Sequence, residues 1–121
     1  MKKSFFIETA ACINGKLLFS SAQPIPVDQL EPIGQMLADS DNCSFIYLAE
    51  LDGEYTYISI PVSLWPDIKE CFVLGVDPIL VQGDNKLNLT GFREELEYLI
   101  ENIKGNSNYG EKMAGAVERI F

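Results

Sequence analysis

The sequence predicts one α+β domain over residues 1–121, with an antiparallel sheet of about six strands from three hairpins. Helices are expected mainly on one face of that sheet, with a further helix at the C-terminus. Two observations carry this prediction. Turn-forming residues separate stretches rich in β-branched and aromatic residues, and apolar residues at helical spacing follow each such pair of stretches. A length of 121 residues with 47% hydrophobic content fits one compact core.

Three turn signals predict the hairpins: Asn14-Gly15, Asp52-Gly53 and Gly83-Asp84-Asn85. Asn-Gly and Asp-Gly tolerate the positive φ angles of a type I′ turn, whose twist matches that of paired strands. The predicted strands cover residues 5–13, 16–21, 44–51, 54–60, 78–82 and 86–89.

A helix is predicted after each hairpin. The first begins at the capping residue Asp28 and carries Leu30, Ile33 and Leu37. The second helix follows Ser63 and ends at Gly75. The third carries the clearest apolar stripe, made of Phe92, Leu96, Leu99, Ile100 and Ile103.

The hairpin followed by a helix thus recurs along the chain. This recurrence fits either an internal repeat or the ordinary alternation of strands and helices in an α+β domain.

The tail from Asn108 to Phe121 predicts a fourth helix. Asn108 and Glu111 have the spacing of a capping box. The apolar residues Met113, Val117 and Ile120 then recur at helical spacing, so the helix has one face to bury on the core or on a partner.

The charge balance restricts the partners. Nine basic and eighteen acidic residues give a net charge of −9, which repels phosphate backbones and anionic lipid and favours basic partners. Glu8 interrupts the short apolar run near the N-terminus, so no signal peptide is expected, and no stretch is long enough to span a membrane. The three cysteines, Cys12, Cys43 and Cys71, form no C-x-x-C pair and are interpreted as buried apolar side chains in a reducing compartment. A cytoplasmic protein is expected, with no nucleic-acid or membrane partner.

The stretch ADSDN, residues 38–42, places carboxylates where a calcium loop would have them. Asp39, Asp41 and Glu50 fit an EF-hand pattern, but Ser44 stands where the loop needs glycine, and a strand follows where a helix should begin. The stretch is therefore interpreted as a turn between a helix and a strand, and no metal is expected.

Catalytic chemistry has few candidate groups. The chain has no histidine, so Ser-His and Cys-His pairs are unavailable. No glycine-rich phosphate loop is present. Carboxylate pairs on the third helix, such as Glu94 with Glu95, fall opposite its apolar stripe and are typical of a solvated face. No enzymatic activity and no cofactor is expected.

Aromatic and acidic residues supply a candidate interaction surface, because tyrosine and tryptophan are enriched in interface hot spots. Whether Trp65 and Tyr109 lie in the core or on the surface stays open at this point. The candidates are Trp65, Glu94, Glu97, Tyr98, Glu101 and Tyr109.

Three stretches, GQMLADSDN (34–42), ISIPVSLWPDIKE (58–70) and GFREELEYLIENIKGNSNYGE (91–111), together resemble the YjbL-like family, short acidic proteins of unknown function from bacilli and related Gram-positive bacteria. The resemblance implies a bacterial cytosolic protein. It carries no activity, cofactor or catalytic residue to transfer.

Three function hypotheses follow. The leading one is a non-enzymatic interaction or regulatory protein of the bacterial cytosol that binds a protein partner with a basic surface through an acidic and aromatic surface. A second is a small-ligand sensor or enzyme that uses Asp or Glu in a pocket. A third is a homo-oligomeric scaffold that pairs with itself through the C-terminal helix.

Overall fold

The computed structural model describes residues 3–121, without the side chains of Cys71 and Ser107. It confirms the predicted α+β class and the C-terminal helix. The elements in chain order are β1 (Lys3–Phe6), β2 (Thr9–Ile13), β3 (Lys16–Ser20), β4 (Glu31–Asp39), β5 (Ser44–Leu51), β6 (Glu54–Pro61), the 3₁₀ turn η1 (Val62–Leu64), α1 (Trp65–Leu74), β7 (Ile79–Gln82), β8 (Asn85–Asn88), α2 (Phe92–Ile103), the 3₁₀ turn η2 (Ser107–Tyr109) and α3 (Glu111–Ile120).

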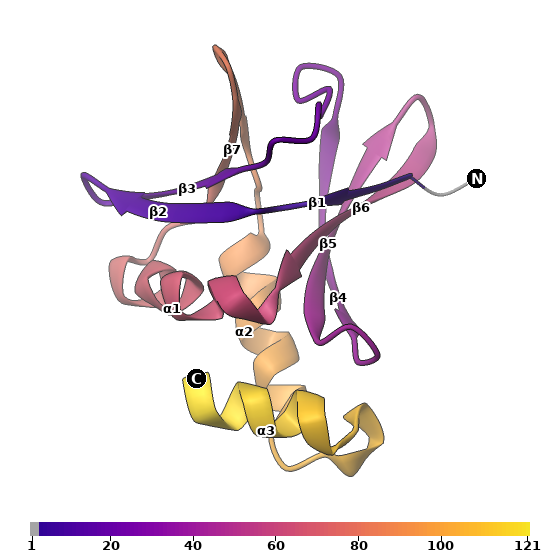
Figure 1. Ribbon diagram of the computed structural model, residues 1–121, viewed down its shortest axis with the longest axis vertical. Coiled ribbons are helices and arrows are strands. Elements are labelled where there is room, and N and C mark those ends of the chain that lie inside the picture. The colour runs from indigo at the N-terminus through magenta and orange to yellow at the C-terminus, as the bar shows by residue number, and fades with distance from the viewer. Residues whose placement is uncertain (1–2) are drawn as a thin grey trace.

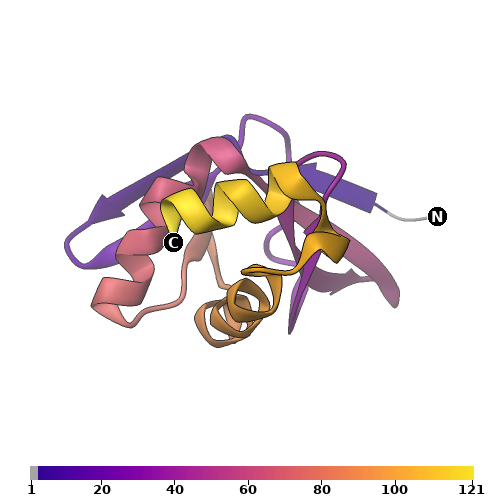
Figure 2. The same ribbon diagram turned by 90° about the horizontal axis from the view of Figure 1, so that it is seen from below.

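The strands form two mixed sheets of four, which differs from the single antiparallel sheet of about six strands that the hairpins suggested. Sheet A has the order β1-β6-β5-β4, and sheet B has the order β2-β3-β7-β8. One pair in each sheet is parallel, β1 with β6 and β3 with β7. Figure 1 shows the three α-helices gathered below the long line of β1 and β2, and Figure 2 shows the same helices from below.

The predicted first strand, residues 5–13, divides between the two sheets. The Ile7 amide donates to the Ser59 carbonyl of sheet A at 2.9 Å, and the next amide, of Glu8, donates to the Ser20 carbonyl of sheet B at 3.0 Å. Successive amides of an extended chain point in opposite directions, so one strand can pair with a different sheet on each side. This crossing joins the two sheets covalently.

The predicted helix after Asp28 is wrong, because residues 31–39 form strand β4. The strand pairs antiparallel with β5, and its register shifts between Pro32 and Met36. An edge strand can accommodate a proline, which lacks an amide donor, and a bulge can accommodate a residue such as Gly34 at φ 82°. The apolar spacing of this segment fits a short helix as well as a strand, and pairing with β5 decides between them.

The three predicted hairpins are confirmed, and β4 with β5 forms a fourth one. ADSDN lies at the turn of this fourth hairpin, so it connects two strands rather than a helix and a strand. The Asp39 carboxylate accepts hydrogen bonds from the Asn42 amide at 3.3 Å and from Asn42 Nδ2 at 2.9 Å. Cys43 adopts φ 49° to close the turn. The carboxylate therefore stabilises the turn that the sequence indicated.

The three α-helices bury the stripes that their spacing predicted. α1 follows Ser63 and ends before Gly75, and α2 buries Phe92 and Ile103 at its two ends. The predicted cap of the tail helix is wrong, because α3 begins after Gly110 and no side chain caps its first turn. Asn108 instead donates its backbone amide to Asn106 Oδ1 at 3.0 Å.

The core packs the inner face of sheet A against sheet B and the helices. The ring of Trp65 stacks on that of Phe45 with centroids 4.1 Å apart, and its Nε1 donates to the Ile60 carbonyl at 3.2 Å. Phe121 contacts both rings, so the end of α3 packs on the start of α1. The face of α3 that carries Met113 is therefore buried against its own chain.

At Gly34, strand β4 comes close to the backbone of the segment that leads into α2. A Cβ at this position would lie 3.0 Å from the Thr90 carbonyl oxygen, whereas a Cβ at Gly53, which has nearly the same φ, would meet open space. We expect Gly53→Ala to lower the free energy of unfolding by about 1–2 kcal/mol through φ alone. Gly34→Ala should lower it further, as measured by urea denaturation. Equal losses in the two variants would contradict a steric role for the Thr90 contact.

Glu8 stabilises the crossing between the sheets in a pH-dependent way. Its Oε1 accepts hydrogen bonds from the Ser21 hydroxyl and the Ala22 amide, both at 2.8 Å, and these bonds hold the pKa of Glu8 below its ordinary value of 4.5. A lowered folded-state pKa gives stability that is present above the ordinary value and is lost as the pH falls through the lowered one. The free energy of unfolding, measured as the pH falls below 4.5, should depend less steeply on pH in Glu8→Gln than in the parent. An unchanged slope would contradict the role of Glu8.

Candidate functional site

Four of the six predicted surface residues form one exposed row along α2. Glu94, Glu97, Tyr98 and Glu101 are three and four positions apart, which places them on one side of a helix. All four are exposed, and Tyr98 keeps 69% of its surface accessible. We call these four residues the acidic stripe.

The other two predicted residues do not join this row. Trp65 is fully buried and stacked on Phe45, so it cannot contact a partner. Tyr109 is half-buried and packs against the core. Aromatic residue type alone does not separate core from surface, because both environments favour aromatics.

A groove lies beside the acidic stripe, between α1 and α2. It encloses about 330 Å³, and Glu97 and Glu101 belong both to its wall and to the stripe. No local sequence pattern predicts this groove, because its walls come from α1, α2 and Phe121. Val73 of α1 stands at its edge and remains 76% exposed. We call this feature the helical groove, and its lining residues are Lys69, Phe72, Val73, Glu97, Ile100, Glu101, Lys104 and Phe121.

The end of α3 closes the base of the helical groove. α3 contacts both α1 and α2, and the rings of Phe72 and Phe121 meet edge to face with centroids 5.8 Å apart. Lys104 Nζ donates to the Phe121 carbonyl at 3.4 Å, which ties the end of α2 to the end of α3. The groove thus has an aromatic floor and mixed charges along its rim.

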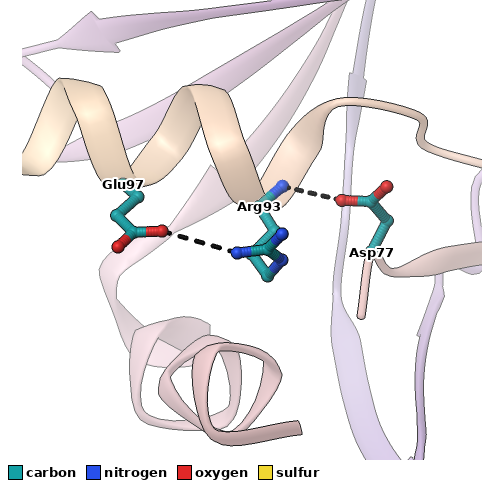
Figure 3. A network of polar contacts seen from close by, with 3 residues as sticks. All are labelled: Asp77, Arg93 and Glu97. Carbon is teal, nitrogen blue, oxygen red and sulfur yellow. Dashed lines mark hydrogen bonds and ion pairs between the residues drawn. The ribbon is translucent and has the colours of Figure 1, made fainter. Parts of the chain in front are cut away.

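The start of α2 is fixed by a side chain from outside the helix. Asp77 Oδ1 accepts the Arg93 amide at 2.9 Å, and its Oδ2 accepts the Gly91 amide at 3.3 Å. Arg93 then forms an ion pair with Glu97, one turn further on, at 3.5 Å (Figure 3). A carboxylate at this position satisfies free amides and complements the helix dipole. The acidic stripe is therefore held on an anchored helix.

Tyr47 links the inner face of sheet A to the same helix start. Its hydroxyl donates to the Thr90 carbonyl at 2.7 Å. Burial, and more weakly the charge of Asp77, raise the pKa of Tyr47 to about 12. The phenol is therefore a protonated structural donor at neutral pH.

The candidate calcium ligands are not brought together. Asp39 lies opposite Ser44 at the turn, whereas Glu50 lies six residues further along β5, about 20 Å away at strand spacing. Within residues 3–121, no group of three or more His, Cys, Asp or Glu side chains is placed to hold a metal ion. The carboxylates of α2 stay on its exposed side, with Glu94 and Glu95 in its first turn.

The cysteine prediction holds only in part. Cys43 is buried, but Cys12 is exposed on β2, and the side chain of Cys71 lies outside the described residues. None of the helices in the described part of the chain is long and apolar enough to cross a membrane.

Removing the Asp77 carboxylate should loosen the start of α2. We expect Asp77→Ala to lower the free energy of unfolding by about 0.5–2 kcal/mol, the usual cost of losing a helix cap. Asp77→Asn retains one side-chain oxygen that can accept the Arg93 amide, so it should lose less. Hydrogen exchange of the Gly91 and Arg93 amides would localise the effect. Unchanged protection of these amides in Asp77→Ala would contradict the assignment.

Comparison with known proteins places the chain in a family. The sequence pattern described as "Family of unknown function (UPF0738)" matches residues 5–121. A UPF0738 protein of Geobacillus sp. strain WCH70 is 43% identical over 122 residues, which cover 100% of this chain and 98% of that protein. UPF0738 protein YjbL of Bacillus subtilis strain 168 is 45% identical over 91 residues, which cover 75% of each chain. No solved structure matches. The chain belongs to the UPF0738 family, as its resemblance to YjbL-like proteins suggested.

Proposed function

We propose that this protein is a non-enzymatic interaction module that binds a protein partner with a basic surface. The binding site comprises the acidic stripe and the helical groove beside it. One observation carries the proposal: Glu97 and Glu101 of the exposed acidic stripe also line the helical groove, whose other lining residues include four apolar side chains. Interfaces of this kind combine a buried apolar anchor with a polar rim.

The charge of the site favours a basic partner. The whole chain carries a net charge of −9, which attracts basic surfaces over a distance at low salt. Within the described residues Glu94 and Glu101 have no ion-pair partner, whereas Glu97 has Arg93. A lysine or arginine of a partner can therefore pair with Glu94 or Glu101 without breaking an existing ion pair.

The groove supplies the apolar part of the interface. Phe72, Ile100 and Phe121 line it, and Val73 stands exposed at its edge. One aliphatic or aromatic side chain of a partner can cover this surface while neighbouring basic residues face the stripe. Lys69 and Lys104, which also line the groove, would repel a uniformly basic segment and so favour an apolar residue at that point.

The tail-mediated homo-oligomer has weaker support. α3 buries Met113, Ala116 and Val117 on its own chain, so a copy that exchanged this helix would first have to undock it. The small-ligand hypothesis for the carboxylates of α2 is also weaker, because Glu94 and Glu95 are exposed and lie outside the helical groove.

The test is capture of partners on the immobilised full chain from a bacillus lysate at low salt. Neutralising three glutamates in E94Q/E97Q/E101Q should reduce recovery of a specific partner about tenfold, at about 0.5 kcal/mol for each exposed charge. Raising the salt should have the same effect on the parent chain.

A matched control separates the site from net charge. D41N/E54Q/D84N makes the same change in charge at exposed positions away from α2 and should retain the partner. Equal losses in the two triple variants would show that only total charge matters. Recovery of no protein other than the chain itself at low salt would overturn the proposal.

A further inference from the structure

The outer face of sheet A contains a second hollow, of about 390 Å³, away from the helices. The inner face of the sheet carries Phe45, Tyr47 and Ile58 into the core, so the alternate residues of the same strands face outward. Ile46 is buried to 9% exposure, yet it does not belong to the core cluster. We call this feature the sheet-face hollow.

The floor of the sheet-face hollow is one row that crosses all four strands. Phe6 of β1 pairs with Ser59 of β6, which pairs with Ile46 of β5, which pairs with Leu37 of β4. Four strands span about 14 Å at a spacing near 4.8 Å. Phe6 is 56% exposed at one end of the row, so its ring is available to a ligand.

Polar groups stand at the two ends of this floor. Asp39 and Asn42, from the ADSDN turn, lie at the β4 end. Ser4 and Tyr57, which pair with each other, lie at the β1 end. Asp39 is the one charged side chain among the described residues that line the hollow. An isolated carboxylate beside an apolar floor favours a cation that carries an apolar body, and it repels anions.

The Asp39 carboxylate has capacity left for such a ligand. Each of its oxygens accepts one hydrogen bond from Asn42, at 3.3 Å and 2.9 Å. An ionised carboxylate offers about four acceptor positions, so about two remain. The hydrogen bonds to Asn42 also hold the carboxylate in a fixed place, which lowers the entropy cost of binding.

From this arrangement we propose that the sheet-face hollow binds a small organic amine, with its ammonium group on Asp39 and its apolar body over Ile46, Leu37 and Phe6. An ammonium group carries three donors, and the two remaining acceptor positions of Asp39 can accept two of them. The volume of about 390 Å³ falls within the range of small-molecule sites. This site is separate from the helical groove and does not rest on the proposed protein partner.

The test is an NMR titration of the full chain with phenethylammonium chloride, against 2-phenylethanol at matched ionic strength. The amine should shift the amides of Phe6, Leu37 and Ile46 in a saturable way, and the neutral alcohol should do so far more weakly. Equal affinity for the two probes, or shifts confined to α2, would overturn the proposal.

Two variants of the same turn make the test specific. Asp39→Asn removes the charge but retains an acceptor for Asn42, and it should weaken amine binding about tenfold or more, the usual loss for a charged hydrogen bond. Asp41→Asn makes the same charge change at an exposed neighbour outside the hollow and should leave the affinity unchanged. A parallel loss in both variants would mean that net charge alone attracts the amine, which would refute the site.

Two further variants test the floor and the independence of the site. Phe6→Ala should weaken binding severalfold, because the exposed ring contributes contact area rather than stability. E94Q/E97Q/E101Q should leave amine binding intact, so failure of this site and failure of the protein-binding proposal are distinguishable. Full affinity in Phe6→Ala would exclude the proposed position of the apolar body.

Discussion

The two sheets depend on the crossing strand at residues 3–13. Ile7 pairs with sheet A and the adjacent Glu8 pairs with sheet B, while the Ile7 side chain is buried at 1% exposure between them. Without this crossing, β1 and β2 would be separate short edge strands, which are marginal alone. The crossing fixes the inner faces of both sheets around one core, and the helices then close that core from one end.

The local part of the fold could be predicted from the sequence, and the arrangement of the sheets could not. Asn14-Gly15 and Asp52-Gly53 specify their turns through backbone conformation, and the apolar residues of α2 recur at helical spacing over twelve residues. Leu30, Ile33 and Leu37 recur at helical spacing too, but Glu31–Asp39 forms a strand that pairs with β5. A nine-residue segment with this spacing fits either state, so a partner distant in sequence decides.

The candidate site also has one part that local sequence predicts and other parts that it does not. The acidic stripe is a property of one helix, so the spacing of Glu94, Glu97, Tyr98 and Glu101 was enough to find it. The helical groove and the sheet-face hollow are each built from several elements, and no local pattern encodes them. The position of Trp65 could not be predicted from its residue type, because a large aromatic side chain fits a core and an interface equally well. Its stacking on Phe45 places it in the core.

Strand β4 connects the two surfaces physically. Near its start, Gly34 lies against Thr90 and Gly91, at the anchored beginning of the helix that carries the acidic stripe. Near its end, Leu37 and Asp39 line the sheet-face hollow. The register shift between Pro32 and Met36 falls beside the first contact, so the strand can meet α2 there and still pair regularly with β5 at the hollow. One bulged edge strand thus contributes to both surfaces, and glycine at residue 34 permits its close contact with the start of α2.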